Sequence, residues 1–206
     1  MQKNDKVFVL TIPRAKERIE KLEEEFKTQG IKNFEIVYGF DYLENKGMKP
    51  HVAVSNGHKQ IVRDNYELPY ITVFEDDVKF TSKKSWEYYV QNFKYLPEWW
   101  DVYLGGVYRP RHLSKIEGLE TIMNCNNYCG LHFYTIRKKF YDKFLTTPDK
   151  AHIDKWIYRL GAASFICDPI PSIQRGVYSY HKNLAVDYSG MDKDLNLLTD
   201  DIPKVC

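Results

Sequence analysis

The sequence predicts an α/β fold in which a mostly parallel sheet is flanked by helices. Short apolar runs rich in β-branched and aromatic residues alternate along the chain with segments of helical periodicity, as in βαβ units. The first run, Val7–Ile12, is apolar throughout, which is typical of a strand buried on both faces. The 206 residues are 43% hydrophobic and 28% charged, a balance that suits one soluble globular domain.

The N-terminal half is predicted to hold four strands and three helices. Leu22 and Phe26 recur at helical spacing in the first helical segment, and Gly30 suits its C-terminal end. Prolines after several segments mark where strands or helices stop. Strands are expected at Val7–Ile12, Phe34–Tyr38, Tyr70–Phe74 and Asp101–Leu104, and helices at Arg14–Gln29, His51–Tyr66 and between Ser82 and Pro97.

The C-terminal half carries weaker patterns. Gly105-Gly106 is expected to end the preceding strand, and the basic stretch Val107–Gly118 is expected to be a loop. Beyond Tyr180 the chain is polar and is expected to wrap the surface. Strands are expected at Leu119–Met123, His132–Ile136 and Phe165–Cys167, and short helices at Arg137–Leu145 and Ile153–Leu160. Since there is neither a repeat nor a linker, we expect a single domain over residues 1–206.

The triplet Glu75-Asp76-Asp77 is the sharpest chemical feature of the sequence. It directly follows the apolar strand YITVF. In open α/β sheets ligands bind outside the carboxyl ends of the strands, where these acids would lie. Adjacent carboxylates repel one another, and a divalent cation such as Mg²⁺ or Mn²⁺ that also holds a diphosphate would relieve that repulsion. A solvated acidic turn is the alternative.

Composition and missing motifs exclude several classes of protein. Thirty basic and 28 acidic residues leave a net charge of +2 without a long block of either sign, so a nucleic-acid-coating protein is not expected. The chain lacks the glycine-rich dinucleotide fingerprint, the P-loop and the nucleophile elbow of α/β-hydrolases. Sixteen tyrosines exceed what a small core needs, which indicates either a ligand groove lined with rings or a simple compositional bias.

No leader, membrane anchor or disulfide framework is expected. The N-terminus leads straight into a strand, and no apolar run approaches the roughly 18 residues that cross a bilayer. The four cysteines form neither a disulfide framework nor a zinc site and are expected to be thiols in a reducing compartment: Cys125, Cys129, Cys167 and Cys206. We therefore expect a cytoplasmic protein.

Ordered segments of the chain resemble one known family. They are VFVLTIPRAKERIEKL, GFD, VSNGHKQIV, ITVFEDDVKF, WWDVYLGG, CGLHFYTIRKKFYDKFL and HIDKWI, which together span roughly residues 6 to 180. In this order they resemble the motifs of glycosyltransferase family 25, which includes lipopolysaccharide glycosyltransferases and collagen hydroxylysine galactosyltransferases. The chain departs from the family's Ser-His helix, because Asn56-Gly57 separates Ser55 from His58.

This resemblance implies a GT-A fold and a sugar-nucleotide donor. Residues of about 1–106 would form a Rossmann-like nucleotide-binding half, and about 107–206 a smaller acceptor-side half. The donor would be a UDP-sugar bound with Mn²⁺ or Mg²⁺, and the acceptor a hydroxyl of a glycan. Compact relatives occur in bacteria and large DNA viruses, which implies the cytoplasm of a bacterium or of a virus-infected cell. No nucleic-acid partner is expected, and the oligomeric state is not predicted.

By position in these motifs, Asp77 is the best candidate metal ligand. Glu75 is a weaker one, acting through water or on the donor ribose. His181 is placed to supply a ligand from near the C-terminus, with a surface histidine as the alternative. Asp76, a catalytic candidate, would touch the ribose or lie exposed.

Donor-binding residues are carried over in the same way. Thr11, Ile12 and Arg14 would lie near the base and ribose, and Arg14 or Arg18 would pair with phosphate, a solvated helix start being the alternative. Three further candidates come from the matched turn and helix: Gly39, Asp41 and His58. Gly105 and Gly106 would let the sugar approach the backbone or would merely end a strand.

Asp154 is the candidate base if the reaction inverts the anomeric centre. Its side chain points off the apolar face of the expected helix, and a carboxylate would have to deprotonate the acceptor hydroxyl. The alternative is a helix-dipole role in the first turn.

Two other functions stay open at this stage. A sugar-nucleotide nucleotidyltransferase shares the metal carboxylates and the nucleotide site, although the segment TIPRAKER lacks the glycines of its usual loop. A non-enzymatic carbohydrate-binding module would use the tyrosines and leave the acids as surface charge.

Overall fold

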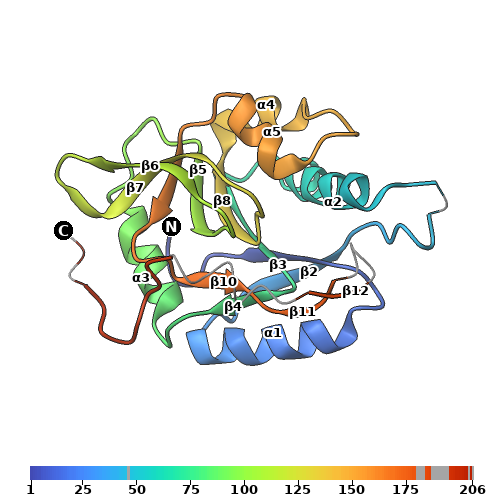
Figure 1. Cartoon of the computed structure of the whole chain (residues 1–206), viewed down its shortest axis with the longest axis horizontal. Coiled ribbons are helices and arrows are strands. Elements are labelled where there is room, and N and C mark those ends of the chain that lie inside the picture. The colour runs from blue at the N-terminus through green and yellow to red at the C-terminus, as the bar shows by residue number, and fades with distance from the viewer. Residues whose placement is uncertain (46, 180–183, 187–194, 204, 206) are drawn as a thin grey trace.

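The computed structural model describes residues 1–45, 47–179, 184–186, 195–203 and 205. It has a mixed α/β architecture in which one large sheet is covered by helices on both faces (Figure 1). The fold class expected from the sequence is therefore confirmed.

The central sheet has eight strands, most of them pointing the same way. β8 and β7 run antiparallel to their neighbours, and the remaining strands share one direction. In spatial order the strands are β2 (Phe34–Tyr38), β1 (Val7–Thr11), β3 (Tyr70–Glu75), β8 (Phe133–Arg137), β5 (Val102–Gly106), β9 (Ser164–Cys167), β7 (Leu119–Asn127) and β6 (Arg111–Ile116).

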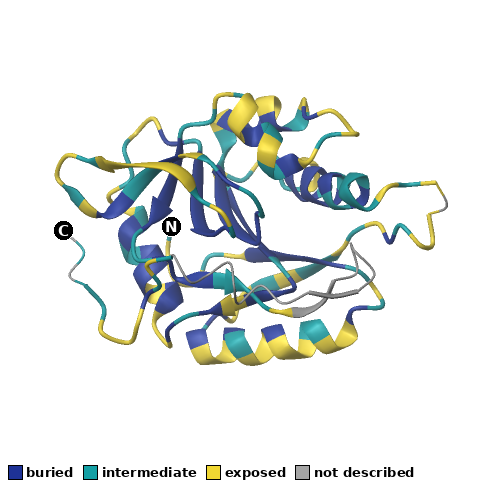
Figure 2. Cartoon of the chain, viewed as in Figure 1, coloured by how far each residue is buried: buried dark blue, intermediate teal, exposed yellow. Residues whose placement is uncertain are grey.

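Two apolar layers bury the faces of this sheet. Helices α1 (Lys16–Gln29) and α3 (Ser85–Phe93) pack on one face. On the other lie α2 (Pro50–Asp64), α4 (Tyr141–Leu145), which follows a 3-10 turn at Lys138–Phe140, and α5 (Ile153–Arg159). Strand β1 contributes to both layers because its successive side chains point to opposite faces. The inner strands of the sheet are accordingly buried, while the outer helix faces are exposed (Figure 2).

Two short antiparallel strand pairs complete the fold. β4 (Val78–Phe80) begins directly after the acidic triplet and pairs antiparallel with β10 (Ser172–Gln174). β11 (Val177–Ser179) pairs antiparallel with β12 (Leu184–Val186). Over the described residues, none of the helices has the length and apolarity that a membrane span requires.

Several elements differ from what the sequence predicts. Residues 107–118 were expected to be a loop but include β6, an edge strand whose side chains are nearly all exposed and so give no apolar signal. Gly105 and Gly106 are the last two residues of β5, so the fourth strand ends two residues later than expected. The short strands β4 and β10 were not expected at all, because three residues are too few to show a periodicity.

The core explains much of the aromatic excess. The fully buried tyrosines are Tyr88, Tyr89, Tyr103, Tyr128, Tyr134 and Tyr141. The described cysteines are free thiols, with Cys125 and Cys167 buried and Cys129 partly exposed.

Candidate active site

The carboxyl ends of three neighbouring strands meet at one edge of the sheet. β2, β1 and β3 are mutually parallel, so the segments that follow them share this edge. A cavity of about 360 Å³ opens there. Its lining includes nine of the predicted site residues: Thr11, Ile12, Arg18, Gly39, Asp41, Glu75, Asp76, Asp77 and Asp154. The sequence motifs thus converge on one place.

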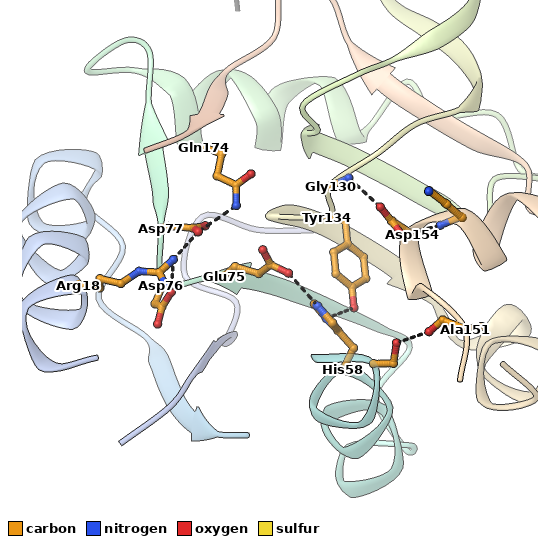
Figure 3. Close-up of polar contacts among 12 residues, drawn as sticks. Arg18, His58, Glu75, Asp76, Asp77, Gly130, Tyr134, Ala151, Asp154 and Gln174 are labelled. Carbon is orange, nitrogen blue, oxygen red and sulfur yellow. Dashed lines mark hydrogen bonds and ion pairs between the residues drawn. The ribbon is translucent and has the colours of Figure 1, made fainter. Parts of the chain in front are cut away.

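Asp76 and Asp77 share a single arginine from α1 (Figure 3). Arg18 Nη2 lies 2.7 Å from Asp76 Oδ1 and also pairs with Asp77 Oδ2. Thr11 donates a hydrogen bond of 2.6 Å to Asp76 Oδ2, and Gln174 donates one of 2.9 Å to Asp77 Oδ2. Asp77 Oδ1 is buried and has no hydrogen-bond partner among the described residues.

Burial dominates the electrostatics of Asp76. It raises the pKa of Asp76 above its ordinary value, against the opposing charge of Arg18 and with the help of the neighbouring Asp77 carboxylate. One guanidinium therefore does not fully compensate the buried negative charge. A further cation at this point would stabilise the ionised carboxylates.

Glu75 is held by a buried histidine on α2. His58 Nε2 lies 3.1 Å from Glu75 Oε1, and His58 Nδ1 lies 3.1 Å from the Tyr134 hydroxyl. The tautomer with a proton on Nε2 satisfies both contacts, donating to Glu75 and accepting from Tyr134. Burial alone would raise the pKa of Glu75, but the hydrogen bond from His58 and nearby positive charge hold it below its ordinary value. His58 is fully buried and does not line the cavity, so it acts on the site through Glu75.

Asp154 stands on the opposite wall, at the start of α5. Its Oδ2 accepts a hydrogen bond of 2.9 Å from the Gly130 amide, and its Oδ1 accepts one of 2.8 Å from the Lys155 amide. These two contacts fix the carboxylate in place. A smaller hollow of about 100 Å³ shares Glu75, Gly130 and Asp154 with the main cavity.

Helix α2 ties the two walls together. Ser55 donates a hydrogen bond of 2.8 Å to the Ala151 carbonyl, just before α5 (Figure 3). The His51 and His152 rings stack with their centroids 4.6 Å apart. The same helix carries His58, which contacts Glu75. Helix α2 therefore contacts both the acidic triplet and the segment that leads into Asp154.

Arg14 and Asp41 bind each other. The Arg14 guanidinium pairs with both carboxylate oxygens of Asp41, through Nε and through a 3.1 Å contact from Nη2. The Leu43 amide donates to the same carboxylate at 3.0 Å. This pairing fixes the loop after β2, whose Phe40 and Tyr42 line the cavity. The structure therefore gives both residues a positioning contact; it shows no free Asp41 carboxylate for a ligand.

Gly105 and Gly106 do not line the cavity. A Cβ on Gly105 would lie 2.1 Å from the Phe133 ring, and one on Gly106 would lie 2.2 Å from His132 Nε2 and from Ser172 Oγ. The absence of side chains here lets Phe133 and His132 pack against β5. Burial lowers the pKa of His132, whose ring nitrogens have no partner among the described residues.

The described residues offer a divalent cation few ligands of their own. In the described part of the chain no group of three or more His, Cys, Asp and Glu side chains is arranged around a common point. The buried, unpartnered Asp77 Oδ1 is nevertheless one free ligand oxygen. Magnesium is commonly held by one or two carboxylates with phosphate oxygens and water completing the shell, so this site suits an ion that binds together with a diphosphate. His181 lies outside the described residues.

Several lining residues escaped the sequence analysis. Gln174 reaches Asp77 because β10 pairs with β4, and Gly130 reaches Asp154 from the turn after β7. Cys129 and Lys155 also line the cavity. Each of these four residues lies more than 30 positions from the triplet in the sequence. Cys129 and Gly130 begin one matched segment and Lys155 lies in another, HIDKWI, whereas Gln174 carried no local signal.

Comparison with known proteins reveals the fold but no family. No protein-family profile and no curated protein matches the sequence. Among solved structures, A197 from STIV has a TM-score of 0.51 at 14% identity, covering 79% of this chain and 81% of its own. A glycosyltransferase involved in the glycosylation of the major capsid of PBCV-1 has a TM-score of 0.51 at 13% identity, covering 91% and 98%.

A nucleotidyltransferase is equally similar. The inositol-1-phosphate CTP transferase from T. maritima has a TM-score of 0.52 at 11% identity, covering 94% of this chain and 98% of its own. At such identities the likeness concerns the fold alone. The chain thus has the GT-A, Rossmann-like fold that glycosyltransferases and sugar-nucleotide nucleotidyltransferases share.

Proposed function

We propose that the protein is a glycosyltransferase of the family 25 type. It would move a hexose or deoxyhexose from a UDP-sugar to a hydroxyl of a glycan, with Mn²⁺ or Mg²⁺. The observation that carries this proposal is one cavity with a buried acidic pair and an arginine at one end and a fixed carboxylate, Asp154, on the other wall. Such a cavity offers separate places for a diphosphate and for an attacking hydroxyl.

We propose one orientation for the donor in the cavity. Phe40 and Tyr42 offer apolar surfaces for the nucleobase, next to Thr11 and Ile12. The diphosphate would then lie by Arg18, whose planar guanidinium suits phosphate oxygens. Asp77 Oδ1 and, by sequence position, His181 would hold the metal ion there. Glu75, oriented by His58, would accept a hydrogen bond from a hydroxyl of the donor.

Asp154 would act as the base in an inverting transfer. Its carboxylate takes the proton of the acceptor hydroxyl while the oxygen forms a bond to the anomeric carbon. The bond from that carbon to the phosphate oxygen breaks, and UDP leaves with the electron pair. A bound divalent ion supplies charge stabilisation to the departing diphosphate. Arg18 contributes a second positive charge on the same side.

A panel of donors tests this function. The protein is incubated with UDP-sugars and Mn²⁺, and released UDP is measured, since water can replace the acceptor in a slow hydrolysis. We expect UDP release with at least one UDP-hexose or UDP-deoxyhexose, lost in Asp77→Asn and kept in Glu23→Gln, an exposed acid on the outer face of α1.

A second assay tests for nucleotidyltransferase activity, which the shared fold also allows. Here the protein receives UTP, a hexose 1-phosphate and Mn²⁺, and pyrophosphate is measured. Pyrophosphate release without any UDP release from UDP-sugars would replace our proposal by that activity. Binding of free sugars with neither reaction would identify a carbohydrate-binding module.

A further inference from the structure

Arg18 neutralises the carboxylates that an incoming metal ion would bind. Its side chain is only 12% exposed and spans from α1 to the acidic pair, touching Asp76 Oδ1 and Asp77 Oδ2. The two carboxylate side chains are themselves only 7% and 10% exposed. The strongest candidate metal ligand is therefore already paired with a buried cation.

We propose that Arg18 couples the binding of the metal ion to the binding of the diphosphate. Its ion pair with Asp77 would break only when a diphosphate replaces Asp77 as the partner of Arg18. The divalent ion would bind poorly alone and well together with the nucleotide. This inference rests on the proposed nucleoside-diphosphate site, but it concerns the order and coupling of binding rather than the transfer reaction.

The contacts around the pair allow such an exchange. Thr11 holds Asp76 on its other oxygen, so the Arg18–Asp76 contact can persist as an anchor. Gln174 continues to donate to Asp77 Oδ2 when the arginine withdraws. Asp77 Oδ1, buried and unpartnered among the described residues, already faces no competing donor. Of the two ion pairs between Arg18 and this acidic pair, the one with Asp77 has to break.

Elementary electrostatics makes the exchange unfavourable without a diphosphate. A divalent ion at Asp77 would lie beside the guanidinium, and two like charges repel strongly where water is largely excluded. Breaking the ion pair would also leave a buried arginine with one carboxylate in place of two. A diphosphate restores the lost partner, since its oxygens accept the fork of guanidinium N–H groups. By linkage, each ligand then strengthens the other.

Calorimetry with Mn²⁺ alone, without nucleotide, tests this directly. Arg18→Gln removes the charge and keeps a polar side chain, so we expect it to bind Mn²⁺ about tenfold or more tightly than the wild type. Arg18→Lys keeps a charge, but its ammonium ends one bond short of the Nη2 nitrogen that contacts both carboxylates, so its Mn²⁺ affinity should fall in between. The double variant Arg18→Gln with Asp77→Asn should lose the gain, which assigns the ion to Asp77.

Arg175→Gln is the matched control. Arg175 pairs with Glu25 at 2.8 Å, and only its backbone amide contacts Asp77, at the carbonyl. Its removal takes away one nearby positive charge and leaves the contacts of the Asp77 carboxylate intact. We expect its Mn²⁺ affinity to stay close to that of the wild type, whereas a gain equal to that of Arg18→Gln would reduce the effect to net charge and overturn the proposal.

Other outcomes also decide the matter. If the Mn²⁺ affinity of Arg18→Gln equals that of the wild type or is weaker, Arg18 does not oppose the metal ion and the proposal is wrong. Absence of Mn²⁺ binding in every variant would also overturn it. Should Arg18→Gln fail to fold by circular dichroism, the comparison of Arg18→Lys with the wild type carries the same test. Tighter Mn²⁺ binding by Arg18→Gln in a protein that binds no UDP would show that Arg18 opposes the metal ion, but it would overturn both the coupling to a diphosphate and the proposed transferase.

Discussion

Asp154 shows how backbone amides can hold one carboxylate in a fixed orientation beside a cavity. Both of its oxygens accept amide hydrogen bonds, from Gly130 and from Lys155, and it lines the main cavity and the smaller hollow. A carboxylate fixed in this way still has lone pairs directed at the cavity. It can therefore receive a proton without first being reoriented.

The variant Asp154→Asn separates a base from a structural acid. We expect kcat for transfer to fall by about 100-fold or more, with UDP affinity little changed, because the amide cannot take the proton. Steady-state kinetics and calorimetry with UDP measure the two quantities. Asp142→Asn, an acid in the first turn of α4 that accepts a hydrogen bond from Tyr66, is the matched control. Equal kcat values in both variants would restrict Asp154 to a role at the helix terminus.

At this scale the sequence predicted which residues would gather at the cavity better than it predicted their contacts. The triplet after β3 was found because an apolar strand ends in three acids. The pairing of Arg14 with Asp41 spans 27 positions, and Arg18 reaches Asp76 from a different element. Such contacts depend on how loops and helices pack, which no local periodicity encodes.

At the scale of elements, the packing of β5 against its neighbours gives a sharp test. In Gly106→Ala the new methyl would overlap His132 and Ser172, both fully buried. We expect a loss of about 1–3 kcal/mol in the free energy of unfolding, the usual cost of overpacking. Urea denaturation measures it. A variant of unchanged stability that no longer binds UDP-sugar would instead support close approach of the sugar to this backbone.

The boundaries of several elements were predicted to within one residue, whereas the strands that lack an apolar pattern were missed. β2 matches its expected range, and α5 differs by one residue at its end. β6 pairs on one side only and exposes its side chains, and β4 and β10 form only with each other. Their formation depends on a partner strand far along the chain, so the local sequence carries little trace of them.

At the scale of the whole molecule, the cavity gathers segments from the entire described length. Its lining runs from Leu10 to Gln174. The tyrosine excess, in contrast, belongs largely to the core, although Tyr108 lines the cavity.

Alkylation of Cys129 reports whether a ligand fills this cavity. Cys129 lines it and is partly exposed, whereas Cys125 and Cys167 are buried. In a Cys206→Ser background, we expect UDP with Mn²⁺ to slow the reaction of Cys129 with iodoacetamide severalfold, because the ligand would restrict access to the thiol. Mass spectrometry of the labelled peptide follows the rate. An unchanged rate at saturating UDP would place the nucleotide elsewhere.

The central claim is that the Asp77 end of the cavity binds a nucleoside diphosphate through a divalent ion. Calorimetry of UDP binding, with and without Mn²⁺, in the wild type and in Asp77→Asn, tests it most directly. We expect Mn²⁺ to tighten UDP binding by about tenfold or more in the wild type and to have no effect in Asp77→Asn. Wild-type UDP binding that ignores Mn²⁺, or an Asp77→Asn variant that keeps the full metal effect, would contradict the account.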